Sequence, residues 1–140
     1  MEKEKLLKAW NDKFNEILGI EYSNPDYFKV HHLLVLTFMI QTDAYSEEYL
    51  PNARELLKRF NTGESPAVFQ SEVKYSKYFN LKDKNKKIRK DEAGRRIDKY
   101  KWNKTIMNVR IDSATNYCSD VTLWAKDVEA IIENKKDIHT

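Results

Sequence analysis

The chain is 140 residues long, with a formal net charge of +3 at pH 7, and 41% of its residues are hydrophobic and 34% charged. Its 3 Gly and 3 Pro leave little turn-forming material for an all-β fold, and its single cysteine excludes an internal disulfide and a cysteine-based zinc cluster. The charged start, residues 1–8, has no apolar segment of a secretory signal. We therefore expect one all-α domain over residues 1–140, a bundle of about five helices in a reducing cytoplasm.

The first predicted helix, residues 2–18, is amphipathic. Gly19 follows it, at the position where a left-handed residue commonly ends a helix. Four large apolar side chains follow one another at steps of four and share one face: Leu6, Trp10, Phe14 and Leu18.

A second predicted helix begins with the capping sequence Ser-Asn-Pro-Asp at residues 23–26 and runs to about Thr42. Within it, residues 30–41 include no Lys, Arg, Asp or Glu, and their apolar side chains lie on every side of a helical wheel. This segment has 12 residues, whereas a bilayer span needs roughly 20. We therefore predict a buried central helix against which the others pack.

A third helix is predicted after Ser46. Pro51 lies past its first turn, where a proline costs about 3 kcal/mol, so either a short turn spans residues 46–49 or the regular helix begins near Pro51. Gly63 ends this helix, and Ser65 opens a shorter one. The buried stripe of the third helix should consist of Tyr49, Leu50, Ala53, Leu56, Leu57 and Phe60.

Residues 80–101 are rich in charge and poor in apolar side chains, which favours a mobile connection or a solvated helix. Apolar character resumes over residues 102–109. The last predicted helix, residues 112–134, has an apolar stripe with spacings of 4, 3, 4 and 3, formed by Tyr117, Val121, Trp124, Val128 and Ile131.

One sector of the central helix, about 120° wide, carries the polar side chains of Tyr27, His31, Thr37 and Gln41. Two interpretations remain open. Either other helices satisfy these polar groups, or the groups line a ligand cleft in which His31 carries a proton or anchors the ligand.

No catalytic residue, metal site or cofactor is predicted. His31 and His32 point about 100° apart on a helix and cannot share a metal ion. Cys118 lies beside the apolar stripe of the last helix, where a small buried hydrophobe is its default role. The sequence contains no Gly-rich phosphate loop and no recognisable nucleophile motif.

Basic residues are concentrated in residues 73–104, which hold 13 Lys and Arg against 4 Asp and Glu, whereas the remainder holds 12 against 18. Such a density attracts phosphates or an acidic protein face. Four flanking aromatic residues are suited to stacking on bases: Tyr75, Tyr78, Tyr100 and Trp102. The alternative is a solvated loop that keeps the protein soluble or folds back on its acidic body. The candidate polyanion-binding residues are Lys84, Lys86, Lys87, Arg89, Lys90, Arg95 and Arg96.

Two longer motifs resemble a bacterial family classed as a domain of unknown function. The first is Tyr-x-x-Val-His-x-Leu-x-Val at residues 27–35, in a segment that ends with Gln41. The second is Trp-x-x-Thr-Ile-x-x-Val at residues 102–109. Members often carry an N-terminal cysteine cluster, absent here, and a His-Pro pair where this chain has Thr42 and Asp43. The resemblance implies no activity. It supports the fold and a candidate cleft lined by Tyr27, His31, Gln41, Trp102 and Thr105.

These observations predict a small non-enzymatic helical binding or interaction protein, whose partner is an unknown protein or small ligand. One alternative is a nucleic-acid or other polyanion binder that uses residues 73–104. A second is an enzyme in which His31 is the general base. No membrane association is expected, and helical proteins of this size often form homo-oligomers.

Overall fold

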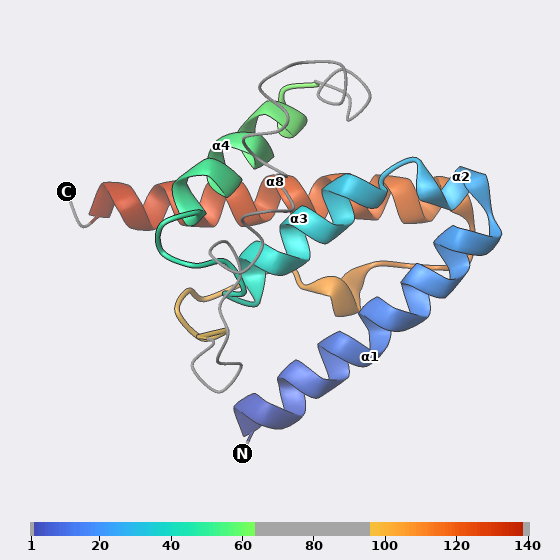
Figure 1. The fold of residues 1–140 in the computed structure, drawn as a ribbon, viewed down its shortest axis with the longest axis horizontal. Coiled ribbons are helices and arrows are strands. Elements are labelled where there is room, and N and C mark those ends of the chain that lie inside the picture. The colour runs from blue at the N-terminus through green and yellow to red at the C-terminus, as the bar shows by residue number, and fades with distance from the viewer. Residues whose placement is uncertain (1, 64–95, 139–140) are drawn as a thin grey trace.

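The computed structural model describes residues 2–63 and 96–138. Within these residues the fold is all-α, as predicted (Figure 1). The predicted helix after Ser65 and most of residues 80–101 lie outside the described part. The elements are α1 (Glu2–Ser23), α2 (Pro25–Phe28), α3 (His31–Gln41), α4 (Leu50–Asn61), the 3₁₀ helix η3 (Ile106–Asn108) and α8 (Ala114–Ile138).

The prediction that Gly19 ends α1 is wrong, because the helix continues to Ser23. Gly19 has no positive φ and is an ordinary helical residue, and the hydroxyl of Ser23 donates to its carbonyl at 2.8 Å. The extra turn carries Glu21 into the interior, where the side chain is only 1% exposed.

The predicted second helix is divided in two, so the prediction of one continuous helix is wrong. The predicted cap is confirmed, because Oδ1 of Asn24 accepts the Asp26 backbone N–H at 3.0 Å and Pro25 opens α2. Val30 then leaves the helical conformation, with φ of −107° and ψ of 19°, before α3 begins. This turn lets α2 place Tyr27 against α8 while α3 takes a different course (Figure 1).

Helix α3 crosses α8 near the middle of the molecule and also contacts α4 (Figure 1). Its aromatic residue Phe38 stacks on Phe14 of α1, with ring centroids 4.2 Å apart and planes 5° from parallel. The predicted burial is confirmed for six residues of the helix, whereas residues 31–33, Val35 and Met39 are only partly buried. The buried side chains are Leu34, Leu36, Thr37, Phe38, Ile40 and Gln41.

Helix α4 begins at Leu50 with Pro51 in its first turn, after a turn over residues 47–49, so both of the predicted alternatives hold. Its predicted stripe is buried apart from Leu50, which is partly buried. Gly63 follows the helix with a φ of +105°, as expected of a terminating glycine.

Helix α8 packs along α2, α3 and α4. The first four residues of its predicted stripe are buried, but Ile131 is partly exposed and Ile132, 4% exposed, takes its place. In the described part of the chain, no helix combines the length and apolar character needed to span a membrane.

The segment that follows Trp102 is fastened to α1 by Lys13. The ammonium of Lys13 donates to the carbonyls of Met107 at 3.1 Å and Val109 at 2.6 Å, and burial lowers its pKa. Ile106 of η3 and Val109 are themselves buried in the core. Helix α1 and the segment around η3 are therefore held side by side (Figure 1).

Candidate functional site

The five predicted cleft residues do not form one cleft. Tyr27 and His31 lie near the start of α3, and Gln41 lies at its end, about 15 Å further along the helix axis. Gln41 and Trp102 line one pocket, and Trp102 and Thr105 line a neighbouring groove. The structure thus brings Gln41, Trp102 and Thr105 together and places Tyr27 and His31 elsewhere.

A buried carboxylate occupies the His31 end. Oε1 of Glu21 lies 2.7 Å from Nδ1 of His31, and Oε2 accepts the hydroxyl of Tyr117 at 2.6 Å. The Glu21 side chain is fully enclosed, whereas the His31 side chain is 16% exposed. When Glu21 is ionised and the imidazole of His31 is neutral, Nδ1 carries the hydrogen and Nε2 is the acceptor nitrogen. Burial, and then the bond to Glu21, raise the pKa of Tyr117.

Aromatic rings surround the imidazole of His31. Phe28 stacks on it with centroids 4.5 Å apart and planes 9° from parallel, and the His32 ring meets it edge-on at 5.4 Å. Tyr22, 71% exposed, lies 5.9 Å from it, centroid to centroid. Burial, and then the proximity of His31, lower the pKa of His32. No hydrogen bond within residues 2–63 and 96–138 engages Nε2 of His31.

Glu21 was not predicted as a site residue, and the sequence did contain a signal for it. It lies one helical turn after Ile17, which is fully buried, so it continues the apolar stripe of α1. The assumed helix end at Gly19 concealed this relation. An acidic residue on the buried stripe of a helix indicates a buried carboxylate that needs donors.

The remaining polar residues of the predicted sector differ in whether their polar groups are hydrogen-bonded. The Tyr27 hydroxyl donates to the Ile111 carbonyl at 3.0 Å, and its ring lies 5.2 Å from that of Tyr117. The fully buried Thr37 hydroxyl makes no hydrogen bond within the described part of the chain. For Tyr27, the structure therefore agrees with the interpretation that the surrounding protein satisfies the polar group.

Gln41 is a buried bridge between two elements. Its Oε1 accepts the indole N–H of Trp124 at 3.1 Å, and its Nε2 donates to the carbonyl of Lys104 at 2.8 Å. The amide is only 1% exposed. The oxygen and the nitrogen of the amide are both hydrogen-bonded within the protein, so Gln41 fixes the position of the segment that carries Trp102 and Thr105.

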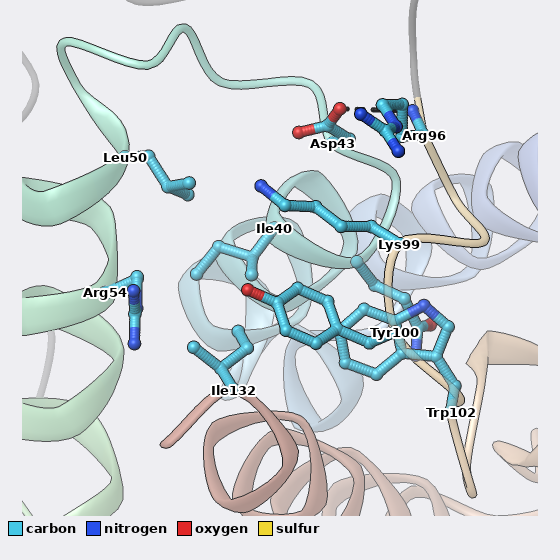
Figure 2. Close-up of a pocket in the computed structure, with 10 residues that line it drawn as sticks. Ile40, Asp43, Leu50, Arg54, Arg96, Lys99, Tyr100, Trp102 and Ile132 are labelled. Carbon is cyan, nitrogen blue, oxygen red and sulfur yellow. Dashed lines mark hydrogen bonds between the residues drawn. The ribbon is translucent and has the colours of Figure 1, made fainter. Parts of the chain in front are cut away.

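The pocket shown in Figure 2, here called the cationic pocket, lies beside Gln41. Arg54 of α4 faces it from one side, and Lys99, Tyr100 and Trp102 line it from the other (Figure 2). Trp102 is fixed by its indole N–H, which donates to the Ile97 carbonyl at 3.0 Å. The enclosed volume is about 10 Å³, which is room for about one water-sized group.

A second and larger cavity, here called the apolar groove, lies between α1 and residues 97–108. Its volume is about 660 Å³. Thr105 lies at the groove and caps η3, with Oγ1 accepting the Met107 backbone N–H at 3.1 Å. Tyr100 and Trp102, 5.2 Å apart between ring centroids, line both cavities. The apolar lining consists of Leu6, Trp10, Ile97, Tyr100, Trp102 and Met107.

Of the candidate polyanion-binding residues, the described part of the chain contains Arg96 alone. It lines the cationic pocket, and its backbone N–H donates to Oδ2 of Asp43 at 3.1 Å. The other candidates lie outside the described residues: Lys84, Lys86, Lys87, Arg89, Lys90 and Arg95.

The described helices define an all-α protein with a buried carboxylate–histidine pair at one end of α3 and two cavities at the other. A family model matches residues 8–131, and the chain belongs to that family, the family of unknown function DUF5946. This confirms the predicted membership of a family of unknown function. Its bacterial origin and the correspondence of single motifs stay predictions. No curated protein and no solved structure gives a significant match.

Proposed function

We propose that the protein is a non-enzymatic binding protein that holds a small, largely apolar ligand in the apolar groove. One observation carries this proposal. Leu6 and Met107 expose 46% and 49% of their surface and line the same groove, which the almost fully buried Trp10 also lines. Large apolar side chains gathered at an open groove are typical of a surface that a ligand covers.

The size and lining of the groove support a small molecule. Its volume of about 660 Å³ falls within the range of about 300–1,000 Å³ that ligand pockets occupy. Its walls are mainly aromatic and aliphatic, and its polar lining residues are Lys3, Asp98, Thr105 and Asn108. Such a lining favours a flat apolar molecule with few polar atoms.

Titration with the neutral fluorescent probe N-phenyl-1-naphthylamine tests the proposal. We expect saturable binding to the wild-type protein. Met107→Lys should weaken it by about tenfold, because the probe loses an apolar contact and faces a charge. Leu123→Lys is the matched control, since Leu123 is 51% exposed and lies outside the groove. Absence of saturable binding, or equal weakening by both variants, would overturn the proposal.

A second candidate function, proton transfer by His31, is favoured by its 2.7 Å contact with Glu21. A buried carboxylate that fixes one imidazole nitrogen orients the other as a general base. Hydrolysis of a panel of p-nitrophenyl esters would test it. Activity should be lost in His31→Gln and Glu21→Gln, persist in His32→Gln, and fall as the pH drops through the range in which histidine side chains take up a proton. Activity that survives His31→Gln would exclude this candidate.

A further inference from the structure

The lining of the cationic pocket is positively charged. Three cationic side chains contribute to it, Arg54, Arg96 and Lys99, and Asp43 is the one acidic residue among its described lining residues. One oxygen of that carboxylate already accepts the Arg96 backbone N–H. With three cations and one carboxylate, the described lining residues carry a formal charge of +2.

Within the described part of the chain, these cations are only weakly neutralised. Arg54 has an ion pair with Glu133, but at 3.7 Å, and 44% of the Glu133 side chain is exposed. Among residues 2–63 and 96–138, neither the Arg96 guanidinium nor the Lys99 ammonium has an ion-pair partner. The ammonium of Lys99 lies 5.9 Å from the centre of the Tyr100 ring, a cation–π distance.

The rest of the pocket is built to hold a small group in place. Ile40 and Ile132 supply apolar surface, and Tyr100 and Trp102 form an aromatic wall on the loop side (Figure 2). The buried amide of Gln41 directs both of its polar ends to other partners. Arg54 is half-buried, and a charge in such a position interacts more strongly than the same charge in open water, whereas Arg96 and Lys99 are exposed.

We propose that the cationic pocket binds a phosphate group. A phosphate, as a monoanionic diester or as a dianionic monoester, offers several negatively charged oxygens to the positively charged lining, whereas a carboxylate offers only two. The guanidinium groups supply planar pairs of donors, which suit phosphate oxygens. The enclosed room accommodates one oxygen, with the remainder of the phosphate at the mouth among Arg54, Arg96 and Lys99. This proposal does not depend on a ligand in the apolar groove, although Tyr100 and Trp102 line both cavities.

Titration with inorganic phosphate, followed by amide chemical shifts in NMR spectra, tests the site. We expect saturable shifts at Lys99, Tyr100 and Arg54. The double variant Arg54→Gln/Lys99→Gln should weaken binding by about tenfold or more, because two charge-assisted contacts are lost. The control variant Lys58→Gln/Lys126→Gln also removes two positive charges, but from exposed positions outside the pocket. It should leave the affinity for phosphate nearly unchanged. Equal weakening by both variants, or no saturable binding, would contradict the proposal.

A competing titration with a single-stranded oligonucleotide identifies the source of the phosphate. If the oligonucleotide displaces inorganic phosphate, with an affinity that falls steeply with salt and a shallower slope in Arg54→Gln/Lys99→Gln, the phosphate belongs to a nucleic acid. If inorganic phosphate binds and the oligonucleotide does not compete, the pocket takes a small phosphate. Both results support a phosphate site, provided that the pocket variant weakens binding and the control variant does not.

Discussion

The hydroxyl of Tyr117 donates to Oε2 of Glu21 at 2.6 Å, across 96 positions of sequence. Neither side chain is accessible, since Glu21 is 1% and Tyr117 0% exposed. The other carboxylate oxygen is bonded to His31, so one carboxylate joins α1, α3 and α8. A buried carboxylate destabilises a fold unless donors compensate for its lost hydration, and here Tyr117 and His31 do so.

Removal of the Tyr117 hydroxyl should therefore destabilise the protein. We expect Tyr117→Phe to lower the free energy of unfolding by about 1–3 kcal/mol, because the buried carboxylate loses a donor. Urea unfolding measures this. Tyr22→Phe is the control, since Tyr22 is 71% exposed, and should stay within about 0.5 kcal/mol of wild type. Equal effects of the two substitutions would show that the buried hydrogen bond contributes nothing.

Two buried threonines should respond in opposite directions to replacement by valine. The Thr37 hydroxyl is buried without a partner in the described part of the chain, so Thr37→Val should stabilise the protein by about 1 kcal/mol. The equally buried Thr42 donates to the Phe38 carbonyl at 2.7 Å, and Thr42→Val should cost about 1 kcal/mol. Thermal and urea unfolding of both variants check the signs, and a loss of stability in Thr37→Val would contradict the assignment.

The two described glycines predict a second pair of opposite effects. A Cβ atom at Gly19 would meet nothing within 4 Å, so Gly19→Ala should raise the free energy of unfolding by about 0.5–1 kcal/mol through helix propensity. Gly63 has a φ of +105°, which residues with a side chain rarely adopt. Gly63→Ala should therefore lower the free energy of unfolding by about 1 kcal/mol or more. The melting temperatures of the two variants should therefore fall on either side of the wild-type value.

The ion pair of Asp120 predicts a pH dependence. Arg110 donates to Asp120 through Nε at 2.9 Å, Nη2 at 3.2 Å and its backbone N–H at 2.9 Å, which lowers the pKa of the carboxyl from its ordinary value of 3.8. Because the folded-state pKa is the lower one, the ionised carboxylate stabilises the fold above the ordinary value, and this contribution is lost as the pH falls through the lowered pKa.

Asp120→Asn should accordingly be less stable than wild type at neutral pH, and the difference should shrink as the pH falls below 3.8. Urea unfolding at a series of pH values measures this difference. Asp12→Asn is the control, because Asp12 pairs with Lys8 on an exposed helix face and should show little difference at any pH. A difference for Asp120→Asn that does not change with pH would contradict the argument.

Periodicity predicted most of the helices because it reports which side chains leave water. The stripes of α4 and of the first half of α8, and the cap at Asn24, depend on residues within a few turns of one another. The break at Val30 was missed, because it depends on how α2 and α3 each meet α8 and not on a local breaker. The end of α1 was misplaced because a glycine also fits a helix interior, at a modest cost.

The candidate site was predicted in part. Gln41, Trp102 and Thr105 were identified and lie together, whereas the pairing of His31 with Glu21 was not foreseen. Arg54 was not foreseen either, because it projects from a helix whose predicted role was packing. Contacts between residues far apart in sequence leave no periodic trace, and such contacts build both cavities.

The two hydrogen bonds of Gln41 also bear on the chemical stability of its side-chain amide. Deamidation replaces a side-chain amide by a carboxylate and so converts its donor into an acceptor. At Gln41 an oxygen would then face the Lys104 carbonyl oxygen across the 2.8 Å now spanned by a hydrogen bond. Since the amide is only 1% exposed, the water needed for this hydrolysis is largely excluded. The enclosure that makes this chemical damage so harmful is therefore also what slows it.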